Sequence, residues 1–298
     1  MPLRTSRYVD LPSATVNLLD YGGSGPLMVL VHGLGGSIAN WNVVAPRWTE
    51  QFRVLALDLP GFGLSPPGRD WSLETHETSI VEFIEYLGGP ALLVGNSMGG
   101  LLTEMVAAHR PDLVTEMLLI SPATPPRLPD PHIDWPMARR LLLNSAPGIG
   151  PVISRRVHST VEPRRLVNES LARITHKPGR VPLELVEAIV EITQIRAGFP
   201  WTPDAIPMTG RAIRKLFMRR GRFVEIIRAI SAPTLVVHGV ADPIVSPTSV
   251  EWLCSLRPDW ALIQMDDTGH TPHIDAPVRF LSAVESWLGA RTEEEVRA

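Results

Sequence analysis

Hydrophobic residues in this 298-residue chain gather into short continuous runs that alternate with segments of helical spacing. Such runs are typical of strands that are buried on both faces of a parallel sheet. The predicted strands are residues 8–11, 15–21, 27–31, 52–57, 91–94, 114–120, 233–238 and 260–265. Apolar residues at every third or fourth position predict helices over residues 72–87, 101–109, 247–256 and 277–288. The alternation predicts an α/β fold with a mostly parallel sheet.

The alternation stops after residue 122 and resumes at residue 231. The segment between these points holds no convincing buried strand. It contains proline-bounded segments with helical spacing instead, at residues 134–144, 163–173, 182–196, 203–219 and 223–230. We therefore expect a core domain made of residues 1–122 and 231–298, with a helical module, residues 123–230, inserted into it.

Charge separates the same two parts of the chain. Residues 123–230 contain 18 Lys or Arg and nine Asp or Glu, a net charge of +9, whereas the remainder contains ten and 22, a net charge of −12. The overall charge of −3 argues against nucleic acid as a partner. The basic module has two interpretations: solvated helix faces that dock on an acidic core, or weak attraction to an anionic substrate or lipid surface. Its paired arginines are Arg139-Arg140, Arg155-Arg156, Arg164-Arg165 and Arg219-Arg220.

Neither a membrane span nor an export signal is expected. No apolar run approaches the ~18 residues that a membrane-spanning helix needs, so stable membrane insertion is not predicted. No apolar run follows the first residues, which predicts that a signal peptide is absent. The single cysteine, Cys254, excludes an intrachain disulfide. We expect a cytoplasmic protein.

The sharpest chemical signal is Gly95-Asn96-Ser97-Met98-Gly99, between a predicted buried strand and a predicted helix. The chain must reverse there within one or two residues, so the positions two before and two after the serine must have almost no side chain. The turn projects the serine hydroxyl above the sheet, beside a helix N-terminus whose free N–H groups can hold an anion. Ser97 is therefore the candidate nucleophile, and a merely structural turn is the alternative.

A serine hydroxyl needs an adjacent base that takes its proton. His270 follows the strand 260–265 by a short loop and lies at the sheet edge where parallel strands end, which is also where Ser97 lies. His273, three residues later, is the rival. We expect His32 to shape the glycine-rich loop that follows it, and His238 to be a hydrogen-bonded histidine of the core.

The base in turn needs an acid that fixes its tautomer and stabilises the imidazolium. Asp242 follows the strand 233–238 on the same edge of the sheet. Asp266 and Asp267 are too close in sequence to His270 to fold back behind it. Glu104, on the helix after Ser97, is expected at the surface. Asp242 is therefore the candidate acid.

Two backbone N–H groups are needed to stabilise the developing oxyanion. The residue after the nucleophile, Met98, supplies one. Leu34, in the loop His32-Gly33-Leu34-Gly35-Gly36, supplies the other. This loop lacks the Lys-Ser/Thr of a phosphate-binding P-loop, which disfavours that alternative.

The order Ser97, Asp242, His270, with the glycine-rich loop upstream, resembles the α/β-hydrolase family over nearly the whole chain. The resemblance implies an eight-stranded sheet flanked by helices, with a helical cap inserted after the sixth strand. It implies Ser97 as nucleophile, His270 as base, Asp242 as orienting acid, and an oxyanion hole at Leu34 and Met98. Relatives with dehalogenase or epoxide hydrolase activity carry aspartate in place of the serine, which disfavours those activities.

The nucleophile motif Gly95-Asn96-Ser97-Met98-Gly99-Gly100 is similar to that of the meta-cleavage-product hydrolases, which cut C–C bonds. Those enzymes usually have tryptophan after the catalytic histidine, whereas this chain has Thr271. We therefore expect an esterase or lipase-like hydrolase, with C–C cleavage, thioesterase, lactonase, perhydrolase or acyltransfer chemistry as alternatives. Some proteins of this fold bind ligands or signal without turnover, so a non-catalytic role is a further alternative.

The expected substrate is small and hydrophobic, an acyl or aromatic compound. Trp41, just past the glycine-rich loop, and Asn96, beside the nucleophile, are predicted to contact it. A few apolar residues of the cap should line the pocket, chosen among Met137, Leu141, Leu142, Ile149, Ile153, Phe199, Trp201, Met208, Phe217 and Met218. The triad needs only water, so neither a metal nor an organic cofactor is implied.

Overall fold

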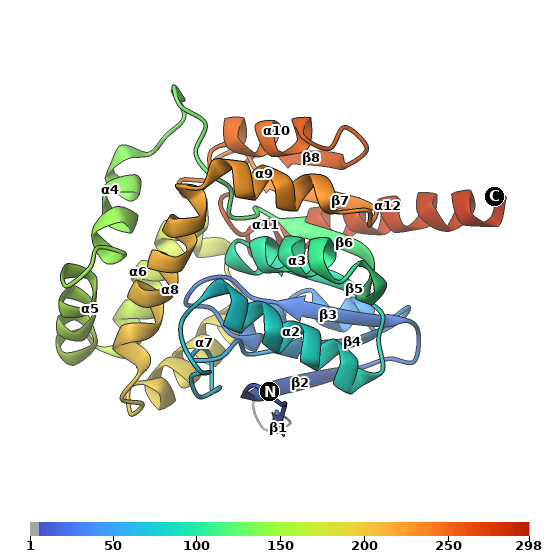
Figure 1. Ribbon diagram of the computed structural model, residues 1–298. Helices are drawn as coiled ribbons and strands as arrows, with labels where there is room; N and C mark the ends of the chain where they lie inside the picture. The colour runs from blue at the N-terminus through green and yellow to red at the C-terminus, as the bar shows by residue number, and fades with distance from the viewer. Residues whose placement is uncertain (1–5, 298) are drawn as a thin grey trace.

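Eight strands form one sheet in the order β1-β2-β4-β3-β5-β6-β7-β8. The computed structural model of the protein describes residues 6–297 (Figure 1). The strands are β1 (Arg7–Asp10), β2 (Thr15–Gly22), β3 (Leu27–Val31), β4 (Arg53–Leu57), β5 (Ala91–Asn96), β6 (Val114–Ile120), β7 (Thr234–Gly239) and β8 (Ala261–Met265). β2 pairs antiparallel with β1 and β4, and all other pairs are parallel. The predicted mostly parallel eight-stranded sheet is confirmed. Residues 1–5, which belong to the segment where no signal peptide is expected, lie outside the described residues.

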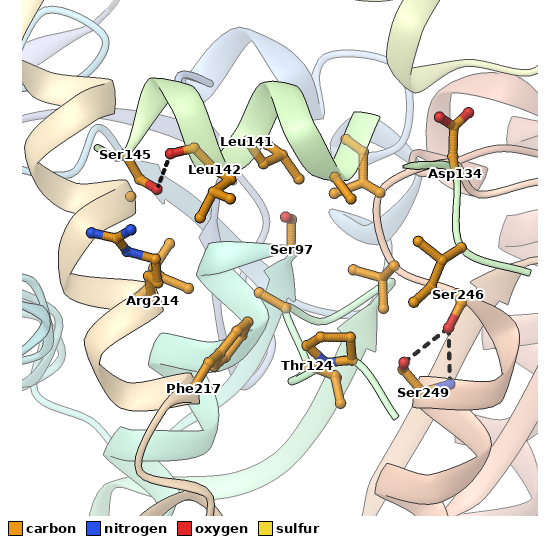
Figure 2. Close-up of a pocket in the computed structure, with 18 of the residues that line it drawn as sticks. Ser97, Thr124, Asp134, Leu141, Leu142, Ser145, Arg214, Phe217, Ser246 and Ser249 are labelled. Atoms are coloured by element: carbon orange, nitrogen blue, oxygen red, sulfur yellow. Dashed lines mark hydrogen bonds between the residues drawn. The ribbon is translucent and has the colours of Figure 1, made fainter. Parts of the chain in front are cut away.

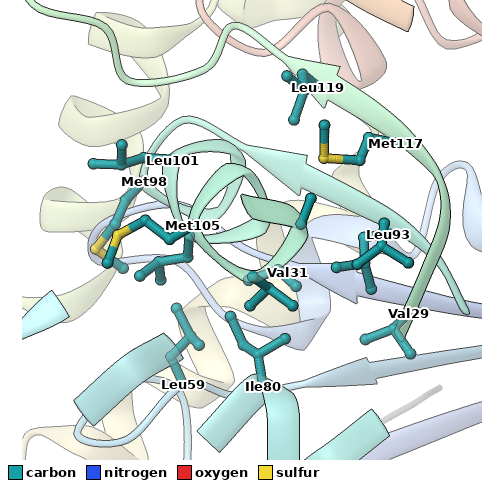
Figure 3. Close-up of a cluster of buried hydrophobic side chains, with 14 of the residues drawn as sticks. Val29, Val31, Leu59, Ile80, Leu93, Met98, Leu101, Met105, Met117 and Leu119 are labelled. Carbon is teal, nitrogen blue, oxygen red and sulfur yellow. The ribbon is translucent and has the colours of Figure 1, made fainter. Parts of the chain in front are cut away.

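The central strands are continuous apolar runs because helices cover both faces of the sheet. Side chains alternate between the faces, so Val29 and Val31 of β3 join one hydrophobic cluster while Met28 and Leu30 join the other. The first cluster packs under α2 (Leu73–Leu87) and α3 (Met98–His109), as Figure 3 shows. The second packs against α1 (Ala45–Trp48) and α12 (Pro277–Arg297).

Helix ends follow local sequence signals. The Ser72 side chain accepts a hydrogen bond from the Thr75 N–H and caps α2, and Gly88 ends that helix in the left-handed conformation. The remaining helices of the core are α10 (Pro247–Ser255) and the short α11 (Pro272–Asp275), with the 3₁₀ turns η2 (Ile38–Trp41) and η3 (Pro111–Leu113). A further 3₁₀ turn, η4 (Pro178–Arg180), belongs to the segment between β6 and β7. Among residues 6–297, no helix is long and apolar enough to cross a membrane.

Six helices connect β6 to β7: α4 (Trp135–Asn144), α5 (Ile149–Thr160), α6 (Pro163–Ile174), α7 (Leu183–Arg196), α8 (Thr202–Phe217) and α9 (Arg220–Ala229). The first five lie at one end of the sheet, and we call them the cap (Figure 1). Residues of α9 instead join the hydrophobic cluster beneath α3, among them Phe223 and Ile227. The hydrophobic pattern did not predict α5.

Candidate active site

Ser97 is the single residue between β5 and α3, and its backbone is strained, with φ 54° and ψ −117°. A side-chain carbon at Gly95 would lie 2.5 Å from the Gly99 carbonyl oxygen, and one at Gly99 would lie 2.1 Å from the Val31 carbonyl oxygen. No larger residue fits at either position without a shift of the backbone. The two glycines are therefore needed because of the space around the turn.

Backbone hydrogen bonds hold this turn in its strained conformation. The Ser97 N–H donates to the Ile120 carbonyl at 2.9 Å, and the Ser97 carbonyl accepts from Leu101 at 3.1 Å and Ala123 at 2.9 Å. Ile120 and Ala123 belong to β6 and the loop that follows it. The neighbouring strand thus fixes the position of the serine.

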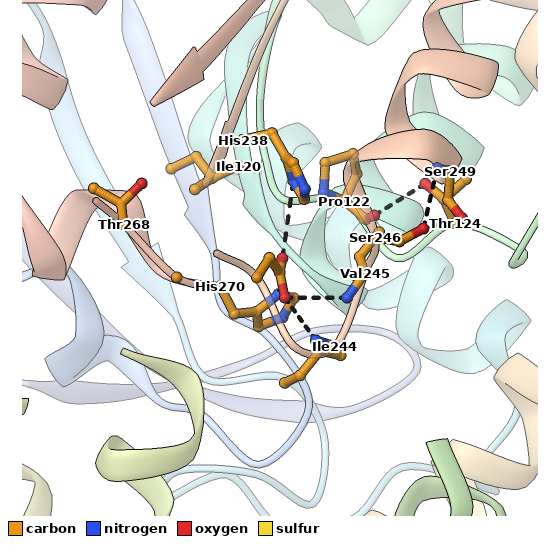
Figure 4. Close-up of polar contacts among 12 residues, drawn as sticks. Ile120, Pro122, Thr124, His238, Ile244, Val245, Ser246, Ser249, Thr268 and His270 are labelled. Carbon is orange, nitrogen blue, oxygen red and sulfur yellow. Dashed lines mark hydrogen bonds and ion pairs between the residues drawn. The ribbon is translucent and has the colours of Figure 1, made fainter. Parts of the chain in front are cut away.

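Asp242 and His270 form a buried, hydrogen-bonded pair. The His270 Nδ1 lies 2.7 Å from the Asp242 Oδ2, and Asp242 Oδ1 accepts the N–H groups of Ile244 at 2.7 Å and Val245 at 3.1 Å. Figure 4 shows both N–H groups beside His270. Burial alone would raise the pKa of Asp242, but the facing His270, assisted by His238 and the Ile244 N–H, lowers it below its usual value. Asp242 is therefore an anion that holds a proton on His270 Nδ1.

Residues of the cap and of α11 fix the His270 loop. The His270 N–H donates to the Ile174 carbonyl of the cap at 2.8 Å. The buried Asp275 carboxylate accepts the Gly269 N–H at 2.7 Å and the His176 N–H at 3.0 Å. These bonds hold the backbone at Gly269 and His270, and they join the cap directly to the histidine loop.

Asn96 also contributes to this support, which corrects the prediction that it contacts the substrate. Its side-chain amide is buried and donates to the Ile120 carbonyl at 3.0 Å and to the His270 carbonyl at 3.3 Å. It does not line the cavity described below. Because it precedes Ser97 in the chain, it links the serine turn to the histidine loop.

The Ser97 side chain points into a cavity between the sheet and the cap (Figure 2). Within the described part of the chain, no hydrogen bond joins the Ser97 hydroxyl to the His270 ring. Hydrogen bonds of this kind are often long or poorly aligned in unliganded sites and tighten when substrate binds. Ser97, with Leu34 and Met98, lines the floor of the cavity.

The two predicted oxyanion-hole residues line the same cavity as Ser97. Met98 is the first residue of α3, so its N–H has no partner within the helix. The Gly36 N–H donates to the Gly33 carbonyl at 3.0 Å and closes a turn around Leu34, with Gly35 in the left-handed conformation at φ +78°. A side-chain carbon at Gly33 would lie 3.2 Å from the Ser97 Cβ, so this turn passes directly beside the serine.

The other candidate histidines are all buried. His32 is buried, donates from Nδ1 to the Gly33 carbonyl at 2.8 Å and accepts the Leu59 N–H at Nε2, and burial lowers its pKa to about 3. His273, the rival base, is fully buried, and burial lowers its pKa to about 3. His238 is buried in the core, as predicted, and its Nδ1 faces the Asp242 Oδ2 at 3.8 Å.

Trp41 does not reach the substrate space, which corrects the second predicted contact. It is fully buried in the cluster on the opposite face of the sheet, with its ring stacked 5.1 Å from the ring of His273. Asp267 pairs with Lys177 and with Arg180 at 3.0 Å, whereas the hydrogen-bond partner of the His270 ring is Asp242. Glu104 is fully buried, contrary to the expectation of a surface position.

The cavity above Ser97 has a volume of about 710 Å³ and mostly apolar walls. Helix α4 contributes Leu141 and Leu142, α8 contributes Phe217, and the loop after β6 contributes Thr124 (Figure 2). Met218 completes the set of predicted cap residues that line it. Among residues 6–297, no group of three or more His, Cys, Asp or Glu could hold a metal ion.

Comparisons with known proteins agree with this architecture. A family model described as "alpha/beta hydrolase fold" matches residues 26–277. The sn-1-specific diacylglycerol lipase ABHD11 of Mus musculus is 27% identical over 275 residues, which cover 91% of this chain and 84% of the relative. The 2-hydroxy-6-oxo-6-(2'-aminophenyl)hexa-2,4-dienoic acid hydrolase of Metapseudomonas resinovorans is 25% identical over 296 residues, covering 96% and 92%.

A similar fold occurs in a solved structure. The crystal structure of a putative lipase from Acinetobacter baumannii superposes with a TM-score of 0.73 at 24% identity, covering 97% of this chain and 92% of that one.

Proposed function

Since the chain belongs to the α/β-hydrolase family, we propose that it is a serine hydrolase that cleaves an ester of a hydrophobic acyl or aromatic substrate. The observation that carries the proposal is the strained Ser97, open to an apolar cavity that Asp242 also lines, with Asp242 hydrogen-bonded to the buried His270. The sequence similarity to a diacylglycerol lipase supports an ester as the bond that is cleaved.

The reaction proceeds in two steps. Ser97 Oγ attacks the ester carbonyl while His270 Nε2 takes its proton, and the imidazolium is stabilised by the Asp242 anion. The N–H groups of Leu34 and Met98 donate to the oxyanion, after which His270 returns the proton to the leaving alcohol. Water then attacks the acyl-enzyme carbonyl while His270 takes its proton, and His270 returns that proton to Ser97 Oγ as the bond to the acid breaks.

The cavity supports a hydrophobic acyl group. Its walls offer aliphatic and aromatic side chains, and about 710 Å³ is within the range that encloses a small organic ligand. Burial of each methylene of an acyl chain contributes about 0.8 kcal/mol. We therefore expect kcat/KM for p-nitrophenyl esters to rise from acetyl to medium-chain acyl groups.

A fluorophosphonate probe tests the nucleophile directly. We expect covalent labelling of the wild-type protein and none of the Ser97→Ala variant, with loss of ester hydrolysis in the same variant. Absence of labelling in a folded wild-type protein would refute the proposal and favour a non-catalytic, ligand-binding role. A strict preference for acetyl esters would refute the hydrophobic acyl substrate alone.

Cleavage of a C–C bond in a dienoic acid is the second candidate. The motif around Ser97 and the similarity to a dienoic acid hydrolase favour it. The cavity wall also includes Arg214, whose Nε is buried without a hydrogen-bond partner, and a guanidinium can bind a substrate carboxylate. Faster turnover of ring-fission dienones than of aryl esters by the same preparation would favour this candidate over the esterase.

A further inference from the structure

The two outermost helices of the cap bury almost nothing. α4 has no buried residue, and the one buried residue of α5 is Gly150. Figure 1 shows these helices at the end of the molecule away from the sheet. Helical stability in globular proteins comes mainly from packing of an apolar face, so the exposed apolar residues of this pair need an explanation.

One face of α5 presents an exposed apolar stripe. Its apolar residues are Ile149, Val152 and Ile153, whose spacing i, i+3 and i+4 places them side by side. Arg156, at i+7, continues the same face of the helix. The three apolar residues are 49%, 63% and 37% exposed. The opposite face packs on α8, because Gly150 lies against the backbone of residue 144 and the side chain of Pro207. The stripe is therefore directed away from α8.

Beside the stripe lies a second cavity, of about 510 Å³, which we call the arginine cavity. Arg139 and Arg140 of α4 and Arg173 of α6 line it, and Ile153 joins it to the apolar stripe. Burial, followed by the charge of Arg140, lowers the pKa of Arg173, which indicates that positive charges are close together here. Asp134 also lines the cavity, but one of its oxygens accepts the Met137 N–H and caps α4.

These arginines have fewer acidic partners than the other arginine pairs of the cap. Arg164 pairs with Glu187 at 2.6 Å, Arg165 with Glu169 at 2.8 Å, and Arg155 with Asp204 at 2.8 Å. Among the described residues, by contrast, no ion pair involves Arg139, Arg140 or Arg156, and Arg173 reaches Glu169 only at 3.6 Å. Residues 135–161 contain no Asp or Glu at all.

We propose that the outer face of α4 and α5 docks on an anionic lipid surface, with a lipid phosphate held in the arginine cavity and the α5 stripe inserted among the acyl chains. Guanidinium groups bind phosphate oxygens through paired hydrogen bonds. A helix with an apolar face and flanking arginines lies in the plane of a membrane interface. The apolar stripe does not suit nucleic acid, and a second copy of the chain would bring the same positive charges together.

Docking there would bring the Ser97 cavity to the lipid. α4 borders both cavities, since Leu141 and Leu142 line the one above Ser97 while Arg139 and Arg140 line the other. This consequence rests on the proposed hydrolase function, whereas docking itself does not.

Co-sedimentation with vesicles tests the docking. We expect the full-length protein to bind vesicles of equal parts phosphatidylglycerol and phosphatidylcholine, to bind pure phosphatidylcholine far less, and to be released by salt. Each arginine near an anionic surface contributes roughly fivefold, so the double variant Arg139→Gln/Arg140→Gln is expected to bind about 30-fold more weakly. The variant Val152→Ser is expected to weaken binding through loss of apolar burial.

The control variant removes two positive charges, as Arg139→Gln/Arg140→Gln does, but outside the proposed docking face. Arg69→Gln/Arg228→Gln replaces two exposed arginines outside the cap and should bind as the wild type does. All these variants should hydrolyse a short, soluble ester at the wild-type rate, and Ser97→Ala should still bind vesicles, so docking and catalysis fail separately. Equal binding to both vesicle types would overturn the proposal, as would an equal loss of vesicle binding in the two double arginine variants. So would self-association that Val152→Ser abolishes.

Discussion

Replacing Glu104 by glutamine is expected to change how the stability of the protein depends on pH. Glu104 lies on α3, is fully buried, and has no hydrogen-bond partner at either carboxylate oxygen. Burial raises its pKa well above the usual value of a glutamate. Glu104 also acts on the thiol of Cys254. Burial, together with the charges of Glu104 and Glu251, raises the pKa of that thiol to about 12.

The sign of the effect follows from proton binding. Below a pH of about 4.3, Glu104 is protonated in both the folded and the unfolded chain, and its contribution to stability is fully present. Above that pH the unfolded chain loses the proton while the folded protein keeps it. The free energy of unfolding therefore falls by about 1.4 kcal/mol per pH unit, until the pH reaches the pKa of the folded state. Glutamine cannot ionise, so Glu104→Gln lacks this slope.

Urea unfolding followed by circular dichroism at several pH values between 5 and 7 measures the difference. The buried amide of the glutamine destabilises the protein by an amount that does not depend on pH, so it shifts the curve without changing its slope. The matched control is Glu184→Gln, the same replacement at an exposed position on α7, which should keep the wild-type pH dependence. If wild type and Glu104→Gln instead differ by a constant amount across this range, the carboxyl is not held protonated and the reasoning is wrong.

Three further changes test the site and its support. Asp242→Asn should lower kcat for a soluble ester by about 10⁴-fold, because the histidine loses the anion that fixes its tautomer, and near-normal turnover would contradict the proposed role. Gly99→Ala places a methyl group 2.1 Å from the Val31 carbonyl oxygen. This clash should reduce the free energy of unfolding, measured in urea, by about 1–3 kcal/mol. Unchanged stability would mean that the turn has room to relax. Asp275→Asn removes a charged acceptor from the Gly269 N–H. It should destabilise the protein by about 1.5–3 kcal/mol in the same urea assay. It should also lower kcat, while the preference among acyl chains stays unchanged.

The fold could be predicted because its strands are buried on both faces. A strand such as β3 is then a continuous apolar run, and a parallel neighbour requires a helix between the strands, so the order of elements follows from the pattern. The positions of Ser97, Asp242 and His270 in the chain follow for the same reason: each lies in the turn or short loop after a strand, and the ends of parallel strands lie along one edge. Their hydrogen bonds depend on loops that the pattern does not describe.

The errors arise where the surroundings of a side chain decide its role. Glu104 is a charged residue on a helix, and its burial depends on which elements cover α3, a helix enclosed on nearly all sides. Trp41 and Asn96 lie near the loop and the nucleophile in sequence, but their side chains are directed to the core and to the histidine loop. α5 was missed because glycine and proline interrupt its first turn and its apolar stripe is exposed.

The hydrogen bond from the His270 N–H to the Ile174 carbonyl bears on how such proteins diversify. Recombination that replaces the cap with that of another protein, whether in nature or in the laboratory, would replace the acceptor of this hydrogen bond together with the wall of the cavity. Chimaeras made at the boundaries of the insert should therefore differ in turnover as well as in selectivity, unless the donor carries an equivalent carbonyl at that place.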